Sequence, residues 1–303
     1  TNASDITLSS NPKLFSYENG PVLKSITIKS QAQGCNSLVQ DIVLFNDLDK
    51  IEIINTIDKK KDYSKENIRF AFPSNIKNPI SRINIAWAVI RPEIDQVTGA
   101  NKNYFTAQRW IDISNSYNGL SIAPVDAPLV EFGGMNGEAW MASPDREWAA
   151  HTSSSALCYS WVMNNSWHTN YKASQEGVAS FRYFLKPHNK FDYLANYKFG
   201  VESSQPLRII YDNNTINNYN QTVKLDPASS IVISVIYPSR DGTGTIIRVF
   251  NPTDKSSSSH ITWLRNSNVK FFLSDGDEEE KQGINDNIKL GPFEVMTIKI
   301  KER

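Results

Sequence analysis

The chain has 303 residues, 40% hydrophobic and 21% charged, a composition typical of a soluble globular protein large enough for two domains. Its 32 basic and 32 acidic side chains cancel, so charge gives no reason to expect nucleic acid or an anionic membrane as a partner. No run of about 20 apolar residues predicts a membrane span, and the N-terminal segment lacks the pattern of a signal peptide. The location is left open by the sequence, with periplasm and secretion both compatible.

Cysteine and histidine give no sign of a disulfide scaffold or a metal centre. The two cysteines, Cys35 and Cys158, are expected to be buried, unpaired thiols that behave as small hydrophobic side chains. The histidines are scattered and show none of the spacings that hold zinc: His151, His168, His188 and His260. We therefore predict no metal site in this chain.

The first part of the chain consists of strand-length apolar runs separated by turn residues. Their β-branched and aromatic residues predict strands at 23–28, 42–45, 51–54, 83–90 and 181–185. Only residues 191–199 show a helical period, and it is weak. Strands without intervening helices predict antiparallel sheets packed on each other, so the expected fold class is all-β.

The pattern changes after residues 201–206, which we interpret as a linker or domain edge. Beyond them, shorter strands are predicted at 207–211, 231–237, 246–250, 261–264, 269–273 and 295–300. About six to eight strands in roughly a hundred residues match the size of an immunoglobulin-like sandwich. We therefore predict two domains, residues 1–204 and 205–303. The acidic run at 277–280 is expected to be a solvated loop.

Two segments, 87–112 and 160–183, mix aromatic side chains with amides and guanidinium groups. This mixture suits sugars, because aromatic rings stack on their C–H faces while Asn, Gln and Arg pair with their hydroxyls. It equally suits a protein core of tryptophans whose amides cap turns and pair buried backbone groups. Composition alone does not decide between the two interpretations.

Several motifs in these segments resemble the C-terminal region of family 38 glycoside hydrolases. The strongest are IAWAVIRPE at 85–93, WIDIS at 110–114, APLVE at 127–131 and WVMNNSWHTNY at 161–171, followed by QEG at 175–177. Further similarity lies at 20–26, 50–58 and from 247 to 298. Order and spacing over most of the chain are more specific than any single motif.

This resemblance implies an architecture and a partner. In the family, the C-terminal region is a large sandwich similar to the galactose-mutarotase-like supersandwich, followed by a smaller sandwich, and it packs against an N-terminal catalytic α/β barrel. Retaining cleavage of α-mannosides uses an aspartate nucleophile and a zinc ion, both in that barrel. No segment here matches the barrel, so no catalytic residue, metal ligand or cofactor is carried over. An exposed apolar patch is expected where the barrel would dock.

The resemblance also implies that loops of the large sandwich line part of a cleft for a mannoside or related glycan. The residues we expect at that edge come from the two polar-aromatic segments: Arg91, Trp161, Asn164, Asn165, Trp167, Asn170 and Gln175.

Two other functions are compatible with the sequence. A carbohydrate-binding module would present a row of exposed tryptophan and tyrosine side chains. A mutarotase-type sugar epimerase would need a histidine acid and a glutamate base converging on one sugar. The residues available for such a pair are His151, His168 and His188 with Glu131, Glu138 and Glu176.

Overall fold

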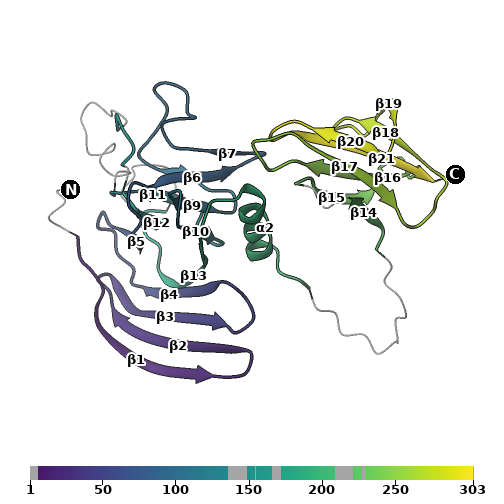
Figure 1. Cartoon of the computed structure of the whole chain (residues 1–303). Coiled ribbons are helices and arrows are strands. Elements are labelled where there is room, and N and C mark those ends of the chain that lie inside the picture. Colours follow the sequence, from purple (N-terminus) through teal and green to yellow (C-terminus); the bar gives the residue numbers. More distant parts are fainter. Residues whose placement is uncertain are drawn as a thin grey trace. The chain divides into compact units, whose positions relative to one another are not determined.

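The computed structural model describes residues 6–135, 149–153, 155–165, 172–208, 221–226 and 230–302. In these residues the chain forms four antiparallel sheets and one helix (Figure 1), which confirms the all-β fold class. Two compact units can be distinguished: unit 1 is Thr1–Asp192 with Lys198–Pro206, and unit 2 is Tyr193–Tyr197 with Leu207–Arg303. Whether the chain folds as two independent domains divided at residue 205 stays a prediction.

Unit 1 contains a nine-stranded and a four-stranded sheet. The large sheet has the strand order β1 (Ser10–Asn19), β2 (Leu23–Gln31), β3 (Cys35–Phe45), β4 (Ile51–Lys59), β13 (Gly177–His188), β10 (Gly119–Pro124), β9 (Ile111–Ser114), β6 (Ile80–Ile85) and β7 (Ala88–Ile90). The small sheet has the order β5 (Asn67–Pro73), β12 (Leu157–Asn164), β11 (Leu129–Phe132) and β8 (Phe105–Thr106).

The core of unit 1 lies where the two sheets face each other. Alternate side chains of β9, such as Ile111 and Ile113, point inward because successive residues of a strand project to opposite faces. They form one cluster with Tyr183 of the large sheet and with Val130 and Phe132 of the small one. Both cysteines are buried and free, as predicted.

The large sheet extends beyond the part that the small sheet covers. On its inner face, cross-strand register aligns Tyr17, Ile26, Ile42 and Ile53 with the core residue Tyr183. Burial decreases along this row: Tyr183 is fully buried, Ile42 and Ile53 are half-buried, Ile26 is 38% exposed and Tyr17 is 75% exposed. The N-terminal end of β3 is covered, because Leu38 packs against Ile68 and Phe70 of β5. The inner face of β1 and β2, with the Ile42–Leu44 part of β3, is therefore largely apolar and exposed; we call it the overhang.

Residues 83–90, predicted as one strand, instead form the hairpin of β6 and β7. Ile85 pairs with Ala88, which leaves Ala86 and Trp87 as a two-residue turn. Trp87 has a φ of 56°, a left-handed conformation that a bulky residue rarely adopts. The apolar run concealed the turn because it lacks the usual Asn or Gly.

The helix α2 (Tyr193–Ser204) begins inside the weakly periodic stretch and continues to Ser204. Val201–Ser204, interpreted as part of a linker or domain edge, thus belong to the helix. In unit 1, Phe199 packs with Trp110, Ala123 and Phe184. Gly200 is required at its position, because a Cβ there would lie 2.5 Å from the Trp110 ring.

Unit 2 is a second, smaller pair of sheets. One has the order β14 (Val223–Asp226), β17 (Ser257–Trp263) and β20 (Asn287–Leu290). The other has the order β15 (Val232–Pro238), β16 (Thr245–Phe250), β21 (Val295–Glu302), β18 (Val269–Ser274) and β19 (Glu280–Ile284). Ile247, Ile261, Leu290 and Ile298, each at most 1% exposed, form the core between them.

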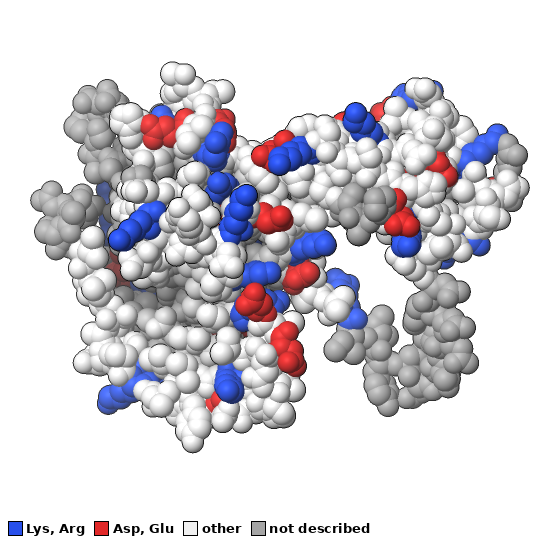
Figure 2. Space-filling view, viewed as in Figure 1, with Lys and Arg blue, Asp and Glu red and all other residues white. Residues whose placement is uncertain are grey.

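The acidic run at 277–280, predicted as a solvated loop, is partly buried, and its last residue, Glu280, begins β19. Glu278 is 5% exposed, and its carboxylate accepts a hydrogen bond from the Arg240 backbone at 2.7 Å. Glu280 pairs with Lys301 at 2.8 Å. Charged side chains of both signs are intermingled over the face shown in Figure 2, as expected for a net charge of zero.

Candidate functional site

Trp161, expected at the edge of a carbohydrate cleft, lies in the core of unit 1. Its side chain is buried at 4% exposure, and its indole Nε1 donates to the Met163 carbonyl at 3.1 Å. The Arg69 guanidinium lies over the ring at 4.4 Å, and Tyr104 contacts it edge-on with 5.9 Å between centroids. Trp161 is therefore not an exposed platform for a sugar; it supports the strands beneath the loops.

The Arg69 side chain forms a buried ion pair with Glu131. The guanidinium donates from Nε to one carboxylate oxygen and from Nη2 to the other, and the two side chains are 4% and 0% exposed. Burial raises the pKa of the Cys158 thiol, and the negative charge of Glu131 raises this pKa further. Burial also raises the pKa of Tyr104. The Arg69–Glu131 pair links β5 to β11, the two strands that flank β12 in the small sheet.

Asn165 follows β12 and holds three loop segments together. Its Oδ1 accepts from the Glu66 backbone N–H at 2.5 Å, and its Nδ2 donates to the carbonyls of Ser64 at 2.7 Å and Ala173 at 3.4 Å. Both ends of the amide are thus used within the protein. Asn164, the last residue of β12, is half-buried and pairs in register with Asn67.

Gln175 is exposed and borders a small cavity of about 40 Å³, together with Met163 and Lys59. Lys59 is buried and forms an ion pair with Glu66 at 2.5 Å. Asn165 is thus bonded to Ala173, two residues before Gln175, and Gln175 shares a cavity lining with Met163, the residue before Asn164. Trp167 and Asn170 lie outside the described residues.

Arg91 lies directly after β7, at the start of a loop that is fixed by carboxylates. Its Nε and Nη2 donate to the two oxygens of Asp95 at 2.9 and 2.8 Å, and this pairing lowers the pKa of Asp95. Glu93, at a φ of 71°, accepts from the Thr152 backbone N–H at 2.9 Å. Its hydrogen bond with His151 lowers the pKa of Glu93. The Arg91 side chain, 44% exposed, is thus held in place by its pairing with Asp95.

Arg69 and Tyr104, which organise this region together with Glu131, were not among the residues predicted from the sequence, where Glu131 was considered as a base for an epimerase. A signal was present: Arg69 and Glu131 are single charges of opposite sign within otherwise apolar strands. In the described residues, no three His, Cys, Asp or Glu side chains are grouped so that they could hold a metal ion.

The residues available to an epimerase have other partners. His188 Nε2 bonds to the fully buried Asp112 at 2.6 Å, and His151 bonds to Glu93. Glu131 pairs with Arg69, and Glu176 pairs with Lys172 at 3.0 Å. His168 and Glu138 lie outside the described residues. The described candidates thus form no histidine–glutamate pair in which an acid and a base converge on one sugar.

Comparison with known proteins agrees with the fold. Residues 2–126 match the model of the glycosyl hydrolases family 38 C-terminal domain. The resemblance to family 38 is confirmed. No curated protein matches the chain. No helix in the described part is long and apolar enough to cross a membrane.

Solved structures show a likeness in fold over nearly the whole chain. An alpha-mannosidase from Enterococcus faecalis V583 is 13% identical and matches 95% of this chain with a TM-score of 0.71. A protein in glycosyl hydrolase family 38 from Enterococcus faecalis, also 13% identical, matches 98% with a TM-score of 0.68. The chain covers 35% and 37% of those two chains, about a third of their length. At such identity the likeness shows the fold.

Proposed function

We propose that this chain is the non-catalytic β portion of an α-mannosidase-type family 38 enzyme. In this proposal it stabilises an N-terminal catalytic barrel and lines part of the carbohydrate cleft. The nucleophile and the zinc ion of the reaction belong to the barrel, and the substrate is a mannoside or a related glycan. The observation that carries the proposal is the fold match, which spans nearly all of this chain but about a third of an alpha-mannosidase.

The overhang supports a docking surface for the barrel. Leu14, Tyr17, Ile26 and Leu44 are all exposed on the inner face of β1–β3, at 63%, 75%, 38% and 47%. An apolar sheet face of this kind is normally covered by another layer. The edge strand β1 carries two register irregularities, which disfavour the addition of a further strand. The sheet face, rather than the edge, is thus the surface for the partner.

The cleft edge is assigned to Arg91, Asn164 and Gln175. The Arg91 side chain is 44% exposed, Gln175 is exposed and Asn164 is half-buried, and guanidinium and amide groups are of the kind that pair with sugar hydroxyls. Asn165 holds the neighbouring loop segments together by hydrogen bonds, and we call it the loop clamp. Trp161 packs in the core. Three of the four described tryptophans, Trp110, Trp161 and Trp263, are buried, so a row of exposed indoles as in a carbohydrate-binding module gains no support from them.

A titration of the isotope-labelled chain with α-mannobiose tests the cleft assignment. We expect amide chemical-shift changes confined to the Arg91–Asp95 loop and the segments around Asn164 and Gln175, with millimolar affinity because one wall of the cleft is missing. Arg91→Ala should remove the shifts in its own loop. Tyr117→Ala, at a site 83% exposed in the same unit, is the matched control and should leave the shifts unchanged. No shift at any of these segments would contradict the assignment.

A further inference from the structure

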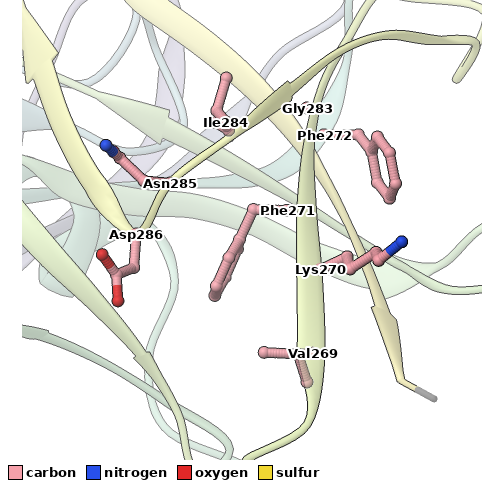
Figure 3. A pocket seen from close by; sticks show the side chains of 8 residues that line it. All are labelled: Val269, Lys270, Phe271, Phe272, Gly283, Ile284, Asn285 and Asp286. Atoms are coloured by element: carbon pink, nitrogen blue, oxygen red, sulfur yellow. The ribbon is translucent and has the colours of Figure 1, made fainter.

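Unit 2 has a groove that the proposed function does not use. It encloses about 470 Å³ beside β18 and the turn that follows β19 (Figure 3). The volume falls within the range of about 300–1,000 Å³ that is usual for small-molecule sites. No residue of the proposed cleft edge lines it.

The groove arises where β19 leaves β18. Pairing of these strands runs from Ser274 to Phe271, which lies opposite Ile284, and then stops. Val269 and Lys270 pair with β21 on one side only among the described residues. The free strand edge is thus about two residues, or roughly 7 Å, long. A peptide strand could not form a ladder over so short a length.

The floor of the groove is apolar and firmly held. Val269, Phe271 and Ile284 are half-buried and pack against the core of unit 2. Figure 3 shows Phe271 and Val269 extending to the side of β18 on which Asn285 and Asp286 lie, whereas Phe272 and Lys270 extend to the opposite side. An aromatic ring fixed by core packing loses little entropy when a ligand stacks on it.

The rim of the groove is polar and is fixed by the turn. Asp286 accepts from the Ile261 backbone N–H through its own carbonyl at 2.8 Å, and its carboxylate lies 3.5 Å from His260 Nε2. The Asn285 Oδ1 accepts from the Asn287 backbone N–H at 3.2 Å. Asn285 and the partly exposed carboxylate of Asp286 therefore lie on the same side of β18 as the Phe271 ring (Figure 3).

We propose that this groove binds a neutral saccharide of one or two rings. Phe271 stacks on the C–H face of the sugar, while Asn285 and Asp286 pair with its hydroxyls. Lys270 and Asp286 cancel in charge, so the lining favours neither an anionic nor a cationic ligand. This site is independent of the proposed cleft, because all its residues belong to unit 2.

The test is a titration of the labelled chain with a panel of neutral saccharides: methyl α-mannoside, α-mannobiose, maltose, cellobiose and lactose. At concentrations well above a millimolar Kd, we expect at least one of them to shift the amides of residues 269–272 and 283–286. Phe271→Leu keeps the apolar packing and removes the ring face, and should weaken binding by about tenfold. Asp286→Asn should weaken it by several-fold.

Tyr237→Leu is the control, since it removes an aromatic ring from β15, a strand of the same sheet that does not line the groove, and should alter the affinity by less than about twofold. The proposal is overturned if no saccharide shifts these amides, or if Phe271→Leu and Tyr237→Leu weaken binding equally. Shifts at residues 91–95 report on the cleft instead, so the failure of one proposal is distinguishable from the failure of the other.

Discussion

The two units bury the inner faces of their sheets to different degrees. In unit 1 a nine-stranded sheet faces a four-stranded one, and the overhang on β1, β2 and the end of β3 stays exposed among the described residues. In unit 2 a five-stranded sheet faces a three-stranded one, and the core residues of both are almost fully buried. The mismatch in unit 1 concentrates exposed apolar side chains on one surface. Unit 1, rather than unit 2, therefore presents the surface suited to a large partner.

The largest expected effect comes from the covered part of unit 1. Glu131→Ala leaves the Arg69 guanidinium buried without its carboxylate, which should lower the free energy of unfolding by about 3–5 kcal/mol. Urea denaturation followed by tryptophan fluorescence measures the loss. Lys172→Ala removes half of an exposed pair and is the control, with an expected loss below about 1 kcal/mol. Equal losses in the two variants would show that the Arg69–Glu131 pair contributes no more than a surface contact.

A smaller loss is expected at the loop clamp. Asn165→Ala leaves the Glu66 N–H and the Ser64 carbonyl without their side-chain partner, which should cost about 1–3 kcal/mol. Hydrogen exchange should become faster at Ser64, Glu66 and Ala173. Exchange in β16 and β21 of unit 2 should not change; acceleration there would mean that the two units unfold as one.

The stability of unit 2 should depend on pH in the acid range, and a single substitution should reduce this dependence. The hydrogen bond from the buried Lys299 lowers the pKa of Asp241 below its ordinary value of 3.8. The Asp241 carboxylate therefore binds a proton less readily in the folded state than in the unfolded state. The Lys299–Asp241 pair thus stabilises unit 2 at pH values above 3.8, and this stabilisation is lost as the pH falls below 3.8. Asp241→Asn should flatten this acid limb in thermal unfolding at different pH values. Because the carboxylate is half-exposed, we expect a modest effect; an unchanged limb would contradict the assignment.

The smallest effect on stability is expected in the overhang. Ile26→Lys places a charge on a side chain that is already 38% exposed, so the free energy of unfolding should change by less than about 0.5 kcal/mol. The variant should also reduce any self-association of the chain, measured by sedimentation. Lys24→Glu on the same strand is the control for a change of charge. A loss of several kcal/mol in Ile26→Lys would show that the overhang is covered within the chain itself.

Local sequence patterns were sufficient for the fold class and for most strands. Alternation identified β2, β4, β13 and β16, because burial of one sheet face imposes a two-residue period. It failed at Trp87, where a left-handed turn interrupts an apolar run without Gly or Asn. It also failed at α2, whose apolar face is too weakly periodic to show its full length.

The candidate site was less predictable, since it depends on contacts between distant residues. Arg69 and Glu131 are 62 positions apart, and only the pairing of β5, β12 and β11 brings them together. The sequence grouped Trp161 with Asn164 and Asn165 as one polar-aromatic patch, but strand alternation buries the first and leaves the others at the loop end. Exposure, which separates a sugar contact from a packing residue, is a property of the assembled sheets.

In the proposed function, this chain shapes and supports a glycosidase without carrying its chemistry. The most direct test is to incubate the purified chain with a chromogenic α-mannoside, with and without added zinc, and to follow release of the leaving group. The account predicts no turnover above the buffer rate under either condition. Zinc-dependent turnover that a chelator abolishes would place a complete active site within these 303 residues and would contradict the account.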